Sequence, residues 1–283
     1  MINFVNKGAE IFVPDGAPAD EALRRTTHMA IAAHQDDVEI MGADGFLKCF
    51  GNPDQWFTAV VVTNGAGSPR ADLYADYTDE MMMAVRKKEQ KKAAYIGEYS
   101  AAVLLDYSSS GVKNPANTAV VGEIKELLNI ARPEVVYTHN LADKHDTHVG
   151  VALRVIKAIR ELPKEARPKK IYGCEVWRSL DWVLDNEKTI FDVSAHPNMT
   201  SALVSIYDSQ VCGGKRYDLA TIGRRTANAT YAESHGTDTA TAYIYAIDLT
   251  PLIEDDNLCP KELIEGYIER FKAEVAKRLD SLS

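Results

Sequence analysis

The sequence has few cysteines and no excess of positive charge, and each shortage excludes a class of protein. Its four cysteines, Cys49, Cys174, Cys212 and Cys259, are scattered without a close pair. Neither a disulfide framework nor a cysteine-bound zinc is therefore expected. The formal net charge is −9, which argues against nucleic acid or an anionic membrane as a partner.

The sequence also lacks a long apolar run. No stretch approaches the length that spans a membrane, and the first residues, MINFVNKGAEIFVPDG, do not have the pattern of a signal peptide. We therefore expect a protein of the reducing cytoplasm. With 283 residues, 46% hydrophobic and 26% charged, the chain is expected to form a single domain over residues 1–283.

The stretch from Met29 to Gly42, MAIAAHQDDVEIMG, is the first candidate for a functional site. A short apolar strand ends in an acidic turn, and an apolar pattern at helical spacing follows. In parallel sheets, ligands bind just beyond the carboxyl ends of the strands. His34 and Asp37 could bind one divalent metal ion there, which leaves Asp36 to face a bound water. Alternatively, the two aspartates only cap the helix, where negative charge is favourable.

Strands and helices alternate along the first half of the chain. Buried strands are expected at residues 29–32, 56–63, 101–107 and 134–138, separated by helices ending near Phe50 and spanning about 78–99 and 117–131. This alternation predicts an α/β fold with a Rossmann-like, mainly parallel sheet and helices on both faces.

The second half of the chain is less regular. Further strands are expected at residues 170–177, 189–194 and 241–248, and a final helix at 260–279. We expect this helix to pack on the sheet of its own chain rather than against a second copy of the protein. A homo-oligomer is not excluded by this expectation. The motif-bearing core covers about residues 28–160, and residues 161–283 form an elaborated C-terminal part.

A second group of metal-type residues follows the fourth predicted strand. The loop from Thr138 to His148 reads THNLADKHDTH. His145 and His148 lie three residues apart at the start of an apolar helix, so their side chains share a face. Both groups fall at the carboxyl ends of strands, on the same edge of the predicted sheet. This convergence favours a metal site over a pair of helix caps.

The two groups together resemble a known family. Residues Ala33–Asp37, AHQDD, resemble the AHPDD signature of the N-acetylglucosaminyl-phosphatidylinositol de-N-acetylase (PIG-L/LmbE-like) family, and HDTH at 145–148 resembles its second HxxH element. The TNG loop after the second strand and Arg86-x-x-Glu89 resemble further family features. The resemblance covers roughly residues 28–160.

This resemblance implies a zinc site and two catalytic residues. His34, Asp37 and His148 would be the zinc ligands, although another divalent metal is possible. Three protein ligands leave zinc an open position, as in catalytic sites. Asp36 would be the general base, and His145, as a protonated imidazole, the acid or oxyanion partner.

The sequence departs from the family pattern at two positions. Gln35 replaces the usual proline of AHPDD, which affects the rigidity of the turn more than its chemistry. Thr147 stands where the family's common HxDH motif has an aspartate. Such a carboxylate could orient the neighbouring histidine. Asp146 or Asp143 could take its place, and the sequence does not distinguish between them.

Further residues are candidates for binding the substrate. The family match suggests that Arg86 reaches the substrate, although it could equally form a helical ion pair with Glu89. Asn64 and Arg70 lie in a loop at the active edge and could bind sugar hydroxyls, or simply be solvated. Trp177 belongs to an aromatic and polar cluster that would suit a sugar ring, although tryptophans are more often core anchors.

The sequence therefore predicts a zinc-dependent hydrolase that removes acetyl from an N-acetylated amino sugar of the N-acetylglucosamine type, or from its conjugate. One alternative is a metal-dependent amidase acting on a different conjugate. Another is a sugar-binding protein in which the two departures have silenced catalysis. Asp36 beside a complete ligand set disfavours the binding protein, because a binder needs no general base.

Overall fold

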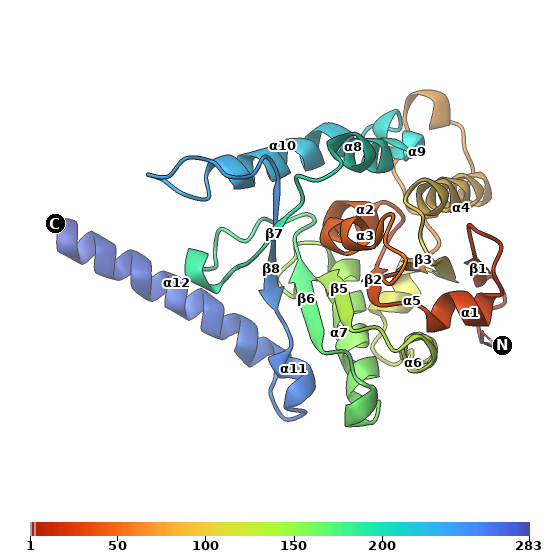
Figure 1. Ribbon diagram of the computed structural model, residues 1–283, viewed down its shortest axis with the longest axis horizontal. Coiled ribbons are helices and arrows are strands. Elements are labelled where there is room, and N and C mark those ends of the chain that lie inside the picture. The colour runs from red at the N-terminus through yellow and green to blue at the C-terminus, as the bar shows by residue number, and fades with distance from the viewer. Residues whose placement is uncertain (1, 3) are drawn as a thin grey trace.

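The structure, a computed structural model, describes residue 2 and residues 4–283. Its centre is an eight-stranded sheet with the strand order β1-β4-β3-β2-β5-β6-β8-β7 (Figure 1). The strands are β1 (Glu10–Phe12), β2 (His28–Ala32), β3 (Phe57–Thr63), β4 (Ala101–Tyr107), β5 (Val135–His139), β6 (Lys170–Cys174), β7 (Thr189–Asp192) and β8 (Tyr243–Asp248).

Helices surround this sheet. The α-helices are α1 (Ala19–Arg24), α2 (Asp37–Met41), α3 (Ala43–Cys49), α4 (Asp79–Ile96), α5 (Ser109–Lys113), α6 (Ala119–Ala131), α7 (Asp146–Arg160), α8 (Pro197–Ser205), α9 (Asp208–Val211), α10 (Tyr217–Thr230), α11 (Pro251–Glu254) and α12 (Pro260–Leu282). Three short 3₁₀ helices are η1 (Asp72–Tyr74), η2 (Lys164–Ala166) and η3 (Asp185–Glu187).

The pairing of the strands confirms the expected α/β fold with a mainly parallel sheet. Strands β4, β3, β2, β5 and β6 are parallel, whereas β1, β8 and β7 add antiparallel pairs at the two edges. The chain runs outward from β2 to β4 and then crosses back to β5 on the other side of β2. In such sheets this reversal opens a crevice beyond the carboxyl ends of the two central strands.

Each face of the sheet buries its own hydrophobic core. One core joins the sheet to α1, α6 and α7, and includes Leu23, Ile124 and Val155. The other joins it to α2, α3, α4 and α8, and includes Phe46 and Leu203. Figure 1 shows α2, α3, α4 and α8 on one side of the sheet and α6 and α7 on the other. Strands β2 and β3 are buried along their whole length, as expected for strands covered on both faces.

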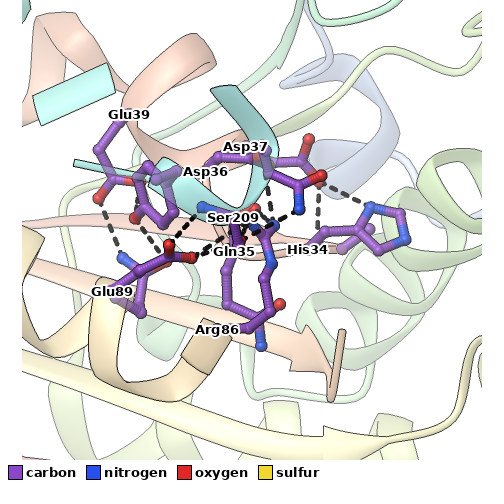
Figure 2. A network of polar contacts seen from close by, with 12 residues as sticks. His34, Gln35, Asp36, Asp37, Glu39, Arg86, Glu89 and Ser209 are labelled. Carbon is purple, nitrogen blue, oxygen red and sulfur yellow. Dashed lines mark hydrogen bonds and ion pairs between the residues drawn. The ribbon is translucent and has the colours of Figure 1, made fainter. Parts of the chain in front are cut away.

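A buried carboxylate holds α2, the helix that follows the acidic turn. Glu39 Oε1 accepts hydrogen bonds from Gln90 Nε2 at 3.0 Å and from the Tyr99 hydroxyl at 2.9 Å. Its Oε2 accepts one from the Tyr207 hydroxyl at 2.6 Å. Burial raises the pKa of Glu39 to about 7, against the lowering effect of these donors. The network, drawn in Figure 2, ties α2 to α4 and to the segment between α8 and α9.

The structure differs from the sequence-based expectation in several elements. The helix expected to end near Phe50 is divided at Gly42 into α2 and α3. A β-carbon at Gly42 would lie 2.8 Å from the Val38 carbonyl oxygen, so the junction has little room for a side chain. The short elements β1 and α1 were not expected, because three to six residues are too few to show a periodic pattern.

The final helix, α12, packs against the hydrophobic core only in its N-terminal half, through Leu263, Ile264 and Tyr267. The expected packing is therefore confirmed for that half and wrong for the rest of the helix. Of its 23 residues, all of which the structure describes, only Ile264 is buried. Leu279 and Leu282 are 62% and 81% exposed. Figure 1 shows the C-terminal half of α12 projecting away from the rest of the protein.

Deleting residues 273–283 should therefore leave the stability of the domain almost unchanged. Little surface is buried there, so we expect the melting temperature to move by less than about 2 °C. Ile264→Ala, which removes the buried anchor, should instead cost about 2–5 kcal/mol. Circular dichroism melts at two protein concentrations test both. A large, concentration-dependent fall on deletion would contradict the prediction and would indicate that α12 packs in an oligomer.

Candidate metal centre and active site

The acidic turn lies directly after β2, at the crevice between β2 and β5. Asp36 has a positive φ of 86°, a conformation that few residues other than glycine adopt. Its side chain makes no capping hydrogen bond to α2 within the described chain. Asp37 Oδ2 instead accepts the His34 backbone N–H at 2.8 Å, as Figure 2 shows. The alternative in which these aspartates only cap the helix is therefore wrong.

Three potential ligand atoms meet at this turn. His34 Nδ1 lies 3.1 Å from Asp37 Oδ2 and 3.2 Å from His148 Nε2. The third side of the triangle, from His148 Nε2 to Asp37 Oδ2, is 3.3 Å. A tetrahedral zinc with ligands at about 2.0–2.1 Å requires its ligand atoms to lie about 3.3–3.4 Å apart. The structure thus brings together the three ligands that the family resemblance implied.

The charges around the triangle also fit a cation. Burial alone would lower the pKa of His148, but the Asp37 and Asp143 carboxylates raise it to about 9. Burial would raise the pKa of Asp37, yet His148 and His34 hold it well below its usual range. The site therefore stabilises a positive charge between these groups. Two imidazole nitrogens and one carboxylate oxygen are donors suited to zinc.

A fourth histidine, His139 at the end of β5, lies behind the triangle. Its Nε2 is 3.6 Å from Asp37 Oδ2, close enough for Asp37, His139 and His148 to form a possible ligand group. However, the same Nε2 accepts the Ala33 backbone N–H at 2.8 Å. Its lone pair is thereby occupied, and the ring stacks on His148 with centroids 3.9 Å apart. His139 is therefore a packing residue of the site rather than a ligand.

Asp143 orients the ring of His148. Its Oδ2 lies 3.3 Å from His148 Nδ1 and accepts the Trp177 backbone N–H at 3.2 Å. Its Oδ1 accepts the His145 backbone N–H at 2.9 Å. The expectation that Asp143 or Asp146 orients the His145 ring needs correction, since Asp143 contacts the ring of His148 and Asp146 is an exposed residue of α7.

Asp143→Asn should weaken metal binding while leaving the three ligands in place. Carboxylates that hold a ligating histidine typically contribute 10–100-fold to metal affinity, so we expect a loss of about that size. Asp146→Asn is the matched control and should bind metal like the wild type. Competition with a chromophoric chelator measures both affinities. Equal affinities for the two variants would contradict the role of Asp143.

Asp36 lies beside the triangle with an arginine against it. Arg86 Nη2 is 3.2 Å from Asp36 Oδ2 and also donates to the Gln35 carbonyl oxygen. Asp36 Oδ2 has no hydrogen-bond partner among the described residues. Burial raises the pKa of Asp36 to about 7, although Arg86 opposes the shift. A buried carboxylate with a pKa near neutrality is suited to accept a proton.

The guanidinium of Arg86 faces protein atoms, which changes the role expected for it. Arg86 is 1% exposed, and its Nη1 lies 3.6 Å from Glu89 Oε2. Glu89 in turn accepts hydrogen bonds from the backbone and hydroxyl of Ser209, at 2.8 and 2.7 Å. Figure 2 shows this group of contacts. Arg86 is thus fixed as the partner of Asp36, and we no longer assign it to direct contact with the substrate.

His145 lies at the mouth of the triangle. Its ring makes an edge contact with His34, with centroids 5.0 Å apart, and stacks on His148 at 4.6 Å. Burial and the neighbouring His148 and His34 lower the pKa of His145 to about 4. This shift favours the neutral imidazole, whereas the sequence led us to expect a protonated one. A neutral ring still offers one N–H donor.

These residues line a cavity of about 500 Å³. His34, Asp36, Asp37 and His145 contribute to its wall, as does Gly65, whose positive φ of 77° and tight contact with Gln35 and Arg86 leave no room for a β-carbon. A larger groove of about 820 Å³ beside β1 and α4 is lined by one carboxylate and no histidine among the described residues. We therefore place the active site in the smaller cavity.

Two residues expected to bind the substrate lie outside this lining. Arg70 donates to the Ala66 carbonyl oxygen at 2.7 Å and to Asp79 Oδ1 at 2.5 Å. Asn64 Oδ1 accepts the Ala66 backbone N–H at 3.2 Å. Both side chains therefore hold the loop itself, and neither lines the cavity in which they were expected to bind sugar hydroxyls.

Other lining residues were missed in the sequence. Lys113 comes from the end of α5, and Lys215 and Tyr217 come from the segment that begins α10. No motif or spacing relates these segments to the acidic turn, because only the fold brings them to it. Trp177, which we considered as a sugar platform, does line the cavity.

Comparison with known proteins finds one family model that matches the part of the chain carrying the site. Residues 29–159 match the family model of the GlcNAc-PI de-N-acetylases, PIG-L. No curated protein matches the sequence.

In the part of the chain that the structure describes, no helix is long and apolar enough to cross a membrane.

Several solved structures share the fold. GalB, the 4-carboxy-2-hydroxymuconate hydratase from Pseudomonas putida KT2440, matches with a TM-score of 0.59 and 15% identity, over 79% of this chain and 96% of its own. The N,N′-diacetylchitobiose deacetylase from Pyrococcus horikoshii matches with 0.59 and 16%, over 78% and 83%. The A40926 pseudoaglycone deacetylase Dbv21 matches with 0.57 and 14%, over 79% and 97%.

At these identities the solved structures establish the fold alone, whereas the family model also matches the region that carries both histidine motifs. The family expected from AHQDD and HDTH is thereby confirmed. Residues 29–159 of this chain, which carry both motifs, therefore match the PIG-L family.

Proposed function

We propose that the protein is a zinc-dependent hydrolase that removes the acetyl group from an N-acetylated amino sugar of the N-acetylglucosamine type, or from its conjugate. The products are acetate and a free amine. The observation that carries this proposal is the triangle of His34, Asp37 and His148, with Asp36 beside it in one cavity. The family itself is one of de-N-acetylases.

Each residue of the site has a separate part in the proposed reaction. A metal ion held by His34, Asp37 and His148 would polarise the amide carbonyl and lower the pKa of a water molecule. Asp36 takes the proton of the attacking water and later gives it to the departing nitrogen.

The other groups position these residues and the substrate. His145 donates its N–H to the amide oxygen as negative charge develops there. Arg86, held by Glu89, keeps Asp36 in place. The cavity of about 500 Å³ lies within the range of about 300–1,000 Å³ typical of small-ligand sites. Trp177 and Tyr217 supply aromatic surface for a sugar ring.

A direct test is amine release from a panel of N-acetylated amino sugars, followed by a primary-amine reagent. We expect turnover that a chelator abolishes and added zinc restores. Amine release that persists after complete removal of metal would overturn the zinc dependence. Release of no amine from any acetylated sugar, together with tight binding of one, would instead favour a silent sugar-binding protein. Turnover of other N-acyl conjugates alone would favour the amidase alternative.

A second candidate function is the hydration of an unsaturated carboxylate. Two observations favour it: the fold is shared with GalB, itself a hydratase, and Lys113 and Lys215 line the cavity. The same preparation tests it, because hydration of a conjugated double bond lowers its ultraviolet absorbance without releasing an amine.

We also propose a cytoplasmic protein, on the basis of its four free cysteines. The projecting α12 leaves a homo-oligomer open. The acidic net charge of −9 supports a small-molecule substrate rather than nucleic acid.

A further inference from the structure

The catalytic cavity adjoins a second cavity, and we refer to the two together as the cleft. The second cavity, of about 270 Å³, shares the lining residues Asp37, Trp177 and Tyr217 with the first. Trp177 thus stands between the two cavities. Its ring centroid lies 6.3 Å from that of His145 and 5.8 Å from that of Tyr217, to which it is nearly perpendicular. A ligand long enough to occupy both cavities would therefore contact Trp177.

The charge of this cleft is opposite to that of the whole protein. Although the chain carries a net charge of −9, the two cavities are lined by five cationic side chains: Arg86, Lys113, Lys144, Lys215 and Arg224. The carboxylates in the two linings are Asp36 and Asp37. Asp37 belongs to the ligand triangle and Asp36 lies against Arg86. An excess of positive charge therefore remains for a ligand.

Three of the five cations have no ion-pair partner among the described residues. Arg86 contacts Asp36 and Glu89, and Arg224 donates to the Val176 carbonyl oxygen. In contrast, no residue within the described ranges, 2 and 4–283, forms an ion pair with Lys113, Lys144 or Lys215.

Two of these lysines lie close to the ring of Trp177. The Lys215 Nζ lies 5.2 Å from the centre of the Trp177 ring, and the Lys144 Nζ lies 5.4 Å from it. Lys113 and Lys215 both line the catalytic cavity. Like charges confined to one cleft repel each other and attract an anion from solution. The lysines therefore favour a ligand that carries negative charge beside Trp177 and in the catalytic cavity.

We propose that the substrate carries a fixed negative charge, a phosphate or a carboxylate, which Lys113, Lys144 and Lys215 bind. This inference rests on the proposed deacetylation and narrows it to anionic N-acetylated amino sugars. The lysines would bind the anion while Trp177 packs against the sugar ring. Exposed ion pairs are weak singly, so the selectivity comes from three ammonium groups acting together.

Kinetics with matched substrates test the proposal. The probes are N-acetylglucosamine, N-acetylglucosamine 6-phosphate and N-acetylmuramic acid, which are neutral, phosphorylated and carboxylated. With the zinc-loaded enzyme we expect kcat/KM to be at least about tenfold higher for an anionic probe, and this preference to decrease with added salt. The probe with the larger preference identifies phosphate or carboxylate as the group recognised.

Lysine variants test whether the higher kcat/KM for anionic probes comes from the lysines. This test is needed because a phosphate can also bind a metal ion. The Lys113→Gln, Lys144→Gln and Lys215→Gln triple variant should lose the preference, mainly through a higher KM. Lys277→Gln, on the exposed end of α12, is the control and should keep it. Equal kcat/KM for neutral and anionic probes in the wild type, or an undiminished preference in the triple variant, would overturn the proposal.

Binding measurements distinguish a failure of the anion site from a failure of the proposed deacetylation. Calorimetry with N-acetylglucosamine 6-phosphate and N-acetylmuramic acid is carried out on the wild type and on the triple variant. If no probe is deacetylated but an anionic probe binds through the lysines, deacetylation of these sugars is wrong and the anion site stands. If the neutral sugar is deacetylated as well as the anionic ones, and binding does not depend on the lysines, the proposed function stands and the anion site is wrong.

Discussion

His148→Ala should release the metal ion and lower kcat/KM for an N-acetylated sugar by at least about 10³-fold. Loss of a catalytic metal removes several kcal/mol of transition-state stabilisation, and each 1.36 kcal/mol corresponds to a factor of about ten. His148 Nε2 is one corner of the ligand triangle, 3.2 Å from His34 Nδ1 and 3.3 Å from Asp37 Oδ2. Elemental analysis after dialysis and amine-release kinetics measure both effects.

A second variant keeps this prediction independent of folding. His148 is fully buried, whereas the side chain of His34 is 21% exposed, so His34→Ala disturbs the core less and should lose metal equally. His235→Ala, in an exposed loop, is the control and should keep metal and activity. Wild-type metal content in both His34→Ala and His148→Ala would show that the ligands are misassigned.

The strands and the ligand groups could be predicted from the sequence because their signals are local. An apolar run of five to seven residues is enough to indicate β2 or β3, which are buried on both faces. The turn at His34–Asp37 and the start of α7 each follow such a run. Because the carboxyl ends of neighbouring parallel strands meet at one edge of a sheet, two local observations predicted one site.

The partners within the site could not be predicted in the same way. Asp143 precedes His145 by two residues and His148 by five, and the sequence does not indicate which ring it contacts. The loop conformation decides this: the His145 backbone N–H binds Asp143 Oδ1, which leaves Oδ2 beside His148 Nδ1. Likewise, Arg86 could be placed near the site from its motif. Its orientation toward Asp36 depends on Glu89 of the same helix, which is held by Ser209 of α9, a partner that the sequence does not indicate.

The sequence does not indicate which residues from distant segments come together in the fold. The three unpaired lysines come from α5, from the loop before α7 and from the loop before α10. On the sequence each is an ordinary charged residue. The extent to which the final helix packs could not be predicted for a related reason: its apolar stripe indicates a face suited to packing but not how much of that face makes contact.

Asp36→Asn should lower kcat by about 10²–10⁴-fold while the protein keeps its metal and its substrate affinity. Asparagine has nearly the same shape as aspartate but cannot accept the proton of the attacking water, and loss of a general base typically costs this much. The substitution leaves the ligand triangle intact, because Asp36 Oδ2 faces Arg86 Nη2 at 3.2 Å rather than His34 or His148. Amine-release kinetics and elemental analysis on the same preparation provide both readouts.

Asp37→Asn, one residue away, is the matched comparison and should give the opposite pattern. Asp37 Oδ2 belongs to the triangle and also accepts the His34 backbone N–H, so its loss should lower metal affinity, and excess zinc should restore part of the activity. If Asp36→Asn loses metal, or deacetylates at nearly the wild-type rate, the two roles are wrongly assigned. Because the two substitutions are chemically identical and adjacent, a difference between them can come only from where each carboxylate points. The backbone of Asp36, at a φ of 86°, separates those two directions.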